Sequence, residues 1–269
     1  ASVNIEDRGY QFSDGVYEVC EVRSGRLVDE RRHLERLGRS LTELRIAMPM
    51  AVESLGVIMR EVVRRNRVRW GIVYLQITRG VSRRDHAFPP AGTKPSIVVT
   101  ARNLDAANAE RLAADGVAVI SVPENRWERV DIKSVSLLPN VLAKQTAREH
   151  GAREAWFVDK QGFVTEGSSS NAWIVTKNNT VVTRHVDHAI LKGITRTVVL
   201  DIIAAQGLKL DVRPFTMDEA YAAKEAFITS ASQTVMPVVK IDGRPIGNGA
   251  PGLLSSALRK DYYRHAEMS

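Results

Sequence analysis

The fold of this chain is most readable from residues 155–183, AWFVDKQGFVTEGSSSNAWIVTKNNTVVT. This stretch contains four short runs rich in apolar, β-branched and aromatic residues, at 155–158, 163–166, 172–176 and 180–183. Turn-forming residues stand between them at 160–162 and 177–179. Short runs of this kind, bounded by Gly, Asn and Asp, are typical of β-strands. Because the strands follow one another so closely, we expect a barrel-like sheet.

Segments on both sides of this stretch combine helices with strands. Toward the N-terminus we expect strands at 16–22, 72–78, 96–100 and 117–122 and helices at 31–44, 52–63 and 138–149. Toward the C-terminus we expect a helix at 195–205, strands at 208–212, 225–229 and 238–241 and a last helix at 253–263. Side chains of a strand alternate between two faces, so we expect Tyr17 to share a face with Val19.

A polar segment rich in Ala, Asn and Asp at 101–114 divides these elements. It lies between two β-like runs, which is typical of a connection between domains. We place the boundary near Asn108. The predicted fold class is α/β, in an α+β arrangement of two domains: a smaller N-terminal α/β domain at 1–107 and a larger C-terminal domain with the barrel-like sheet at 108–269.

Composition narrows the class of protein. Apolar residues make up 44% and charged residues 26% of the chain, and no run approaches the roughly 18 apolar residues that a membrane helix needs. The N-terminus has no basic flank followed by an apolar stretch, so we expect a cytoplasmic protein. The single cysteine, Cys20, is expected to be a buried strand residue, and no Cys/His group has zinc spacing, so we expect no metal.

The net charge of +7 raises the question of nucleic acid. The densest basic stretch is REVVRRNRVR at 60–69. Apolar residues recur there at helical spacing, which places the arginines on the solvated face of an amphipathic helix. No aromatic residues interleave with them as a base-stacking surface requires. We therefore expect no nucleic-acid partner, although a basic protein also attracts anionic small molecules.

A lysine stands between a predicted strand and a predicted helix, in RWERVDIKS at 126–134. At such a junction Lys133 can project into a cleft. A lysine forms a Schiff base with an aldehyde cofactor when its pKa is lowered, and nearby cations such as Arg126 or Arg129 would contribute. From these residues alone, a surface lysine is the ordinary interpretation.

A glutamate ends a predicted strand in VTEGSSSN at 164–171. The small polar turn after it allows close backbone approach, so Glu166 can present its carboxylate into a pocket and keep a pyridine nitrogen protonated. A serine-rich surface loop is the alternative.

Three segments offer donors for an anion. Gly193 opens a helix whose first amides, at Ile194 and Thr195, can bind a phosphate. Ser230 and Ala231 end another strand with free amides. Arg36 can supply a fork of donors. Taken singly, each has an ordinary structural explanation, such as a helix cap or a surface ion pair.

A loop bounded by proline, RGVSRRDHAFP at 79–89, places Arg84 and His86 two residues apart. In an extended segment these two side chains face the same side and can grip one carboxylate.

Taken together and in this order, these segments resemble the D-amino acid transaminases. These belong to the fold type IV pyridoxal-phosphate enzymes, with the branched-chain aminotransferases and aminodeoxychorismate lyases. The resemblance runs from about residue 6 to residue 258. It is carried by DRGYQF at 7–12, DGVYE at 14–18, HLERL at 33–37, DIKS at 131–134, TEGSSSN at 165–171 and LKGITR at 191–196.

The resemblance implies pyridoxal 5′-phosphate as cofactor and a role for each candidate residue. Lys133 would carry the cofactor as a Schiff base and move the substrate proton, while Glu166 would pair with the pyridinium nitrogen. The remaining roles are phosphate binding by Arg36, Gly193, Ile194, Thr195, Ser230 and Ala231, packing under the ring by Leu191, binding of the substrate carboxylate by Tyr17, Arg84 and His86, and a further active-site arginine at Arg126.

The implied reaction is a ping-pong transamination from a D-amino acid such as D-alanine to a 2-oxo acid such as 2-oxoglutarate, by a homodimer whose partner loop helps close each site. The pair Arg84 and His86 favours D-amino acids because it resembles the D-specific carboxylate trap. A branched-chain L-aminotransferase and an aminodeoxychorismate lyase are alternatives on the same fold. A basic nucleic-acid-binding protein is the alternative from another class.

Overall fold

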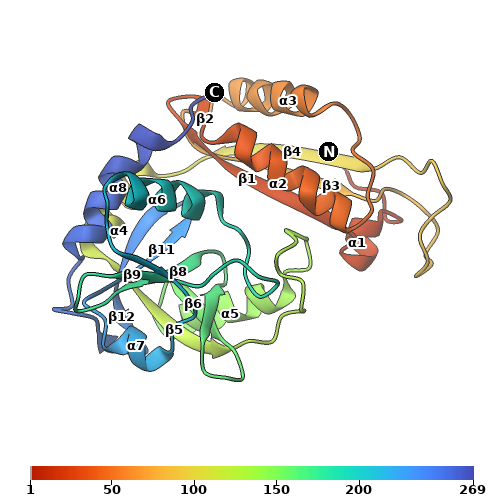
Figure 1. Ribbon diagram of the computed structural model, residues 1–269. Coiled ribbons are helices and arrows are strands. Elements are labelled where there is room, and N and C mark those ends of the chain that lie inside the picture. Colours follow the sequence, from red (N-terminus) through yellow and green to blue (C-terminus); the bar gives the residue numbers. More distant parts are fainter. Residues whose placement is uncertain (1) are drawn as a thin grey trace. The chain divides into compact units, whose positions relative to one another are not determined.

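The computed structural model describes residues 2–269 and groups them into two compact units. Unit 1 is the chain up to Asp105 together with Ile132–Leu137 and Glu267–Ser269. Unit 2 consists of Ala106–Asp131 and Leu138–Ala266. Lys133 therefore belongs to unit 1, although the chain on both sides of its short segment belongs to unit 2. Mixed helices and strands with a curled sheet in unit 2 confirm the predicted fold class (Figure 1).

Unit 1 is built on a four-stranded antiparallel sheet in the order β2-β1-β3-β4. Its strands are β1 (Gly15–Arg23), β2 (Arg26–Leu27), β3 (Trp70–Thr78) and β4 (Ser96–Asn103). Its helices are α1 (Arg8–Phe12), α2 (Glu30–Glu43) and α3 (Val52–Arg65). Apolar residues of α2 and α3 form one core cluster with β1 and β3, so both helices cover the same face of the sheet.

Burial alternates along β1 as predicted. Val16, Glu18, Cys20 and Val22 are buried under the helices, while Tyr17 and the alternate residues after it are only half-buried. On this half-buried face Tyr17 lies beside Gln76, its register partner on β3.

The arginines of α3 lie on its exposed side. Arg64 and Arg65 are both 72% exposed and form ion pairs with Glu61 within the same helix. This confirms the interpretation of the basic stretch as the solvated face of an amphipathic helix.

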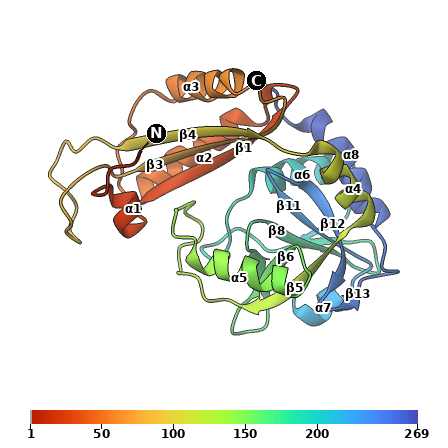
Figure 2. The ribbon, with the colours of Figure 1, turned by 180° about the vertical axis from the view of Figure 1, so that it is seen from behind.

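Unit 2 contains a nine-stranded mixed sheet in the order β10-β9-β8-β11-β12-β5-β6-β7, with β13 paired to β12. Its strands are β5 (Val117–Pro123), β6 (Glu154–Val158), β7 (Val164–Gly167), β8 (Asn171–Val175), β9 (Val181–Thr183), β10 (Leu210–Val212), β11 (Glu225–Ser230), β12 (Thr234–Ile241) and β13 (Arg244–Pro245). Its helices are α4 (Ala106–Asp115), α5 (Leu138–Glu149), α6 (Ile194–Ala205), α7 (Met217–Tyr221) and α8 (Leu253–His265). Figure 2 shows α5 beside β5 and β6.

Several strands of this sheet are buried on both faces. Every residue of β7 and β8 is buried, and Trp156 and Trp173 are fully enclosed. Polar residues on these strands must therefore find partners inside the protein. Several of them carry the site described below.

Three short helices differ from the sequence prediction. Residues 106–115, expected to belong to a polar connection, form α4 because five alanines favour a helix there and Leu112 and Ala113 pack on the core. The five-residue helices α1 and α7 are too short to show an apolar period. A capping box between Thr216 and Glu219 starts α7. Among the described residues, no helix is long and apolar enough to cross a membrane.

Candidate active site

Glu166 lies near the end of β7 with only 6% of its surface exposed. Its carboxylate accepts hydrogen bonds from Asn171 Nδ2 at 2.9 Å and from the backbone amide of Leu191 at 3.0 Å. Arg126 Nη1 lies 2.7 Å from its other oxygen. These donors come from three different segments of unit 2, so they fix the carboxylate from three sides.

Burial raises the pKa of Glu166, and this effect outweighs the lowering by the Arg126 charge and hydrogen bonds. A carboxylate with raised proton affinity binds a protonated nitrogen strongly, because pairing removes the cost of holding an isolated charge away from water. Glu166 is therefore suited to pair with a protonated aromatic nitrogen.

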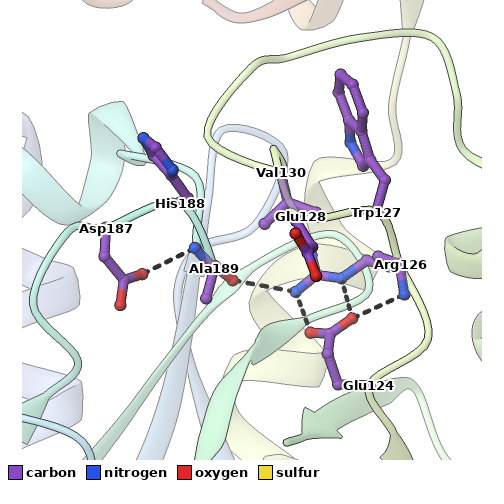
Figure 3. Close-up of a pocket in the computed structure, with 8 residues that line it drawn as sticks. All are labelled: Glu124, Arg126, Trp127, Glu128, Val130, Asp187, His188 and Ala189. Atoms are coloured by element: carbon purple, nitrogen blue, oxygen red, sulfur yellow. Dashed lines mark hydrogen bonds and ion pairs between the residues drawn. The ribbon is translucent and has the colours of Figure 1, made fainter.

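Arg126, which binds Glu166, also binds a second acid, Glu124 (Figure 3). Its Nε and Nη2 donate to the two Glu124 oxygens at 2.9 and 2.6 Å, and Nη2 also donates to the carbonyl of Ala189 at 3.3 Å. Burial would lower the pKa of Arg126, but Glu166 and Glu124 together raise it, so the guanidinium is charged. A hollow of about 550 Å³ lies against this ion pair, between residues 124–130 and the loop at Asp187.

The start of α6 lies close to the same glutamate. Gly193 is the N-cap and has no side chain to bond the first amides, those of Ile194 and Thr195. A Cβ at Gly193 would lie 2.0 Å from Asn171 Oδ1, so only glycine lets the helix start approach this strand. Asn171 also donates to the carbonyl of Leu191 at 2.9 Å, which fixes the segment leading to the helix.

A buried cation stands in the first turn of α6. Arg196 is 3% exposed, and its Nη2 donates to the carbonyl of Arg184 at 2.8 Å. The Nε atom has no hydrogen-bond partner, and the Arg196 side chain forms no ion pair within residues 2–269. Burial lowers the pKa of Arg196, while the charge of Glu166 opposes this. This positive charge and the helix amides suit an anion at the helix start.

The predicted pair Ser230 and Ala231 lies at the same end of the sheet. Thr229 on β11 is the register partner of Asn171 on β8, so Ser230 lies beside the turn that connects Glu166 to Asn171. Unit 2 thus gathers Glu166, Leu191, the α6 start and the Ser230 turn.

Lys133 lies in unit 1 against Tyr17. Its Nζ is 4.1 Å from the centroid of the Tyr17 ring, and the Tyr17 amide donates to the Lys133 carbonyl at 3.0 Å. The neighbouring residue, Ser134, forms an isolated antiparallel bridge with Val16. Lys133 is half-buried, and within the described chain its amine forms no ion pair.

Arg36 lies on α2 and binds Glu18 on β1. Its Nε and Nη2 each donate at 2.8 Å to the two oxygens of that carboxylate, and His33 Nδ1 donates to it at 2.7 Å. Burial would raise the pKa of Glu18, but the charge and hydrogen bonds of Arg36 hold it well below its usual range. Burial lowers the pKa of His33. The group therefore consists of a carboxylate, a guanidinium and a neutral imidazole.

Arg84 and His86 contact one aromatic ring in unit 1. Arg84 Cζ lies 4.5 Å from the centroid of Phe12, and the His86 ring centroid lies 5.4 Å from it. Both side chains are exposed. The structure thus brings this pair together on Phe12, from a loop that Asp85 ties to Arg8 through its carbonyl at 2.7 Å.

Sequence reasoning assigned no role to Glu18, Glu124 or Asn171. A signal existed for Glu18, because the alternation of β1 places it on the same face as Val16 and Cys20, where an acid needs a cation. Nothing near Glu124 in the sequence shows that Arg126 also reaches Glu166, since that contact depends on the pairing of distant strands.

Comparison with known proteins places this geometry in a family. The family model described as amino-transferase class IV matches residues 15–241. The chain belongs to the class IV aminotransferases. A D-alanine aminotransferase from Bacillus licheniformis is 43% identical over 254 residues, which are 94% of this chain and 88% of the relative. One from Staphylococcus aureus strain MSSA476 is 37% identical over 99% of this chain and 93% of the relative.

A solved structure shows the same fold. It is the T.th. branched-chain amino acid aminotransferase, crystallised with pyridoxamine 5′-phosphate. It superposes with a TM-score of 0.89 at 27% identity and covers 98% of this chain and 88% of that one. The predicted membership in the fold type IV enzymes is confirmed.

Class IV aminotransferases use pyridoxal 5′-phosphate, and the side chains of each unit fit this group. In unit 2, the orphaned Nε of buried Arg196 and the uncapped amides of α6 suit a phosphate, while Glu166 suits a ring nitrogen. In unit 1, the amine of Lys133 lies against an aromatic ring, and no acid of the described chain binds it. Among the described residues, no group of three or more His, Cys, Asp or Glu could hold a metal ion.

Proposed function

We propose that this class IV aminotransferase transfers the amino group of a D-amino acid such as D-alanine to a 2-oxo acid such as 2-oxoglutarate. The observation that carries the cofactor chemistry is the buried Glu166, held by three donors beside an uncapped helix start. Both bacterial relatives described above are D-alanine aminotransferases by name, which supports the D-amino acid as donor.

Lys133 would hold the cofactor and act as the acid and base. When bound, pyridoxal phosphate supplies an aldehyde that takes up the amino group and a ring that accepts electrons from the reacting carbon. The Lys133 amine, once released from the cofactor, would move the proton between the substrate Cα and the cofactor C4′. Its place against the Tyr17 ring, with no acidic partner among the described residues, keeps the amine available for this transfer.

The unit 2 residues would bind the two ends of the cofactor. Glu166 would accept the proton-bearing ring nitrogen, and Arg126 would keep this carboxylate ionised. The amides of Gly193, Ile194 and Thr195 would bind the phosphate. The Ser230 and Ala231 turn would also bind the phosphate, and Leu191 would pack under the ring. From unit 1, Arg36 would be a further phosphate ligand.

Tyr17, Arg84 and His86 would bind the substrate carboxylate. Arg84 and His86 both contact the Phe12 ring, so the Arg84 guanidinium and the His86 imidazole lie close together. Two donors of this kind on one side of the substrate orient the carboxylate and so select the hand of the Cα. Arg83 adds a further cation to the loop.

We also propose a homodimer in which the partner's loop helps close each site. Helix α5 supports this, because Leu138, Val141 and Leu142 lie on one face and are 68%, 58% and 57% exposed. Exposed apolar patches of this kind are typical of contacts between proteins. A cytoplasmic location remains part of the proposal.

The test is a half-reaction with each enantiomer of alanine. The purified, cofactor-loaded protein is mixed with D-alanine or L-alanine in separate cuvettes, and the absorbance of the lysine-bound cofactor is followed. We expect conversion with D-alanine only. The Lys133→Ala variant should lack both that absorbance and turnover, whereas Lys160→Ala, an exposed turn lysine, should match the parent. Conversion by L-leucine and not by D-alanine would instead indicate a branched-chain aminotransferase.

A further inference from the structure

A second buried carboxylate lies behind the turn that follows Glu166. Glu154 is the first residue of β6 and is 1% exposed. It is distinct from the residues proposed to contact cofactor or substrate. A fully buried acid is costly unless its oxygens are satisfied, so its partners show what it holds in place.

Those partners are the three consecutive serines of the turn. Ser168 Oγ donates to Glu154 Oε1, while Ser169 Oγ and Ser170 Oγ donate to Oε2 at 2.7 and 3.1 Å. The Ala155 amide adds a fourth bond at 3.0 Å. One carboxylate therefore fixes every side chain of the turn.

Further contacts show that the turn is built around this acid. Lys144 on α5 supplies the counter-charge, with its Nζ 3.2 Å from Glu154 Oε1 and its side chain 41% exposed. The backbone of the turn closes through the bond from the Gly167 amide to the Ser170 carbonyl at 2.7 Å. A Cβ at Gly167 would lie 2.3 Å from Ser170 Oγ and 3.1 Å from Glu154 Cγ, so glycine is needed for this approach.

We propose that Glu154 is a positioning residue for the reaction, which acts by holding the serine turn so that Glu166 and Asn171 keep their geometry. This inference rests on the proposed pairing of Glu166 with the ring nitrogen. Glu166 precedes the turn and Asn171 follows it, and the two side chains bond one another across it at 2.9 Å.

Glu154 and the three serines hold one another in place. The three serine hydroxyls converge on one acceptor pair, and ionised acceptors make hydrogen bonds about twice as strong as neutral ones. Replacing Glu154 by Gln exchanges one accepting oxygen for a donating NH₂ group, which cannot accept from a hydroxyl. At least one serine must then rotate, and the turn between Glu166 and Asn171 loses part of its support.

The chain offers a matched control. Glu225 on β11 is also buried, at 6% exposure, and accepts from a serine hydroxyl, Ser255 Oγ at 3.1 Å, and from two backbone amides at the start of α8. Glu225→Gln therefore makes the same chemical change at a site that does not hold the Glu166 turn.

The experiment measures the protonation of the cofactor ring directly. Holoenzyme is prepared with cofactor labelled with ¹⁵N at the ring nitrogen, and the ¹⁵N chemical shift is recorded for the parent and for Glu154→Gln, Glu225→Gln and Glu166→Gln. We expect the shift of Glu154→Gln to move toward that of Glu166→Gln and the shift of Glu225→Gln to stay at the parent value. The rate of the half-reaction with D-alanine should fall about tenfold in Glu154→Gln, since small misplacements of reacting groups are costly.

A parent-like ¹⁵N shift in Glu154→Gln, with a changed shift in Glu166→Gln, would overturn the role of Glu154 alone. A parent-like shift in Glu166→Gln would overturn the ring pairing and this inference with it. If Glu154→Gln does not fold, Ser169→Ala replaces it, because Ser169 is exposed and its loss removes one of the three donors. Its shift should move in the same direction by less, and no movement would refute the proposal.

Discussion

Replacing Arg126 by methionine should both destabilise the protein and weaken the hold on Glu166. The Arg126 side chain is 4% exposed and binds Glu124 and Glu166, whose side chains are 19% and 7% exposed. Methionine keeps much of the volume and removes the charge. Two nearly buried carboxylates then lose their common cation.

The size of the effect follows from this geometry. Removing one partner of a buried ion pair costs about 3–5 kcal/mol, because the other charge remains buried and unpaired. We expect a loss of about 4 kcal/mol for Arg126→Met. The double variant Glu124→Gln/Arg126→Met removes one of the two stranded acids. Glu166 keeps Asn171 and the Leu191 amide as donors, so the double variant should recover about 2 kcal/mol.

The loss should grow as the pH rises. The pKa of Glu166 is already raised by burial, and without Arg126 it rises further. Between its unfolded-state pKa and this raised pKa, the folded state binds more protons than the unfolded state, so stability falls with increasing pH. In the parent, Arg126 lowers the pKa of Glu124 although burial would raise it, so ionised Glu124 stabilises the folded state. The variant loses this stabilisation. The gap to the parent is therefore smallest at acid pH.

Urea unfolding of the parent, both single variants and the double variant, at acid and at slightly alkaline pH, measures these terms. Strictly additive losses in the double variant, or a gap to the parent that narrows with increasing pH, would refute the reasoning. A change in the urea dependence itself would indicate an altered unfolded state instead of a lost ion pair.

Three further predictions concern other parts of the site. Glu18→Gln leaves Arg36 buried without its carboxylate, so the free energy of unfolding should fall by about 3 kcal/mol. Since the pKa of Glu18 is lowered, this contribution is full at neutral pH and is lost as the pH falls below 4.5. Urea unfolding at neutral and acid pH measures it, and the same difference between parent and variant at both pH values would contradict the prediction. Gly193→Ala places a Cβ 2.0 Å from Asn171 Oδ1 and should raise the dissociation constant of the cofactor by about tenfold or more, whereas unchanged fluorescence titration would count against a tight helix start. Arg84→Ala should raise KM for D-alanine by about tenfold with little change in melting temperature, because the side chain is exposed, and an unaltered KM would remove Arg84 from substrate binding.

Much of the fold follows from local patterns in the sequence. The close strands of 155–183 are readable because each is short, apolar and bounded by a turn, and β1 is readable because its side chains alternate. The segment expected as a polar connection contains α4 because the intrinsic helix preference of alanine and packing on the core outweigh its polar composition.

The site was predictable in part. Lys133 and Glu166 stand out only through the order of several motifs, since each alone has an ordinary surface explanation. The supporting contacts could not be predicted, because Glu18 meets Arg36 through the packing of a helix on a strand and Glu154 meets the serines through the pairing of β6 with β7. Such contacts depend on tertiary structure and leave no local pattern.

The membership of Ile132–Leu137 in unit 1 has a consequence for anyone who wishes to cut or recombine this protein. The chain passes from one unit to the other at four places, so a single cleavage near Asp105 leaves Ile132–Leu137 and Glu267–Ser269 of unit 1 on the piece that carries unit 2. A chimaera made by exchanging everything before that point for the corresponding half of another enzyme would leave Lys133 in a foreign setting, packed against a borrowed tyrosine or none. Exchange of units between relatives must therefore carry this six-residue insert along with the strand that borders it.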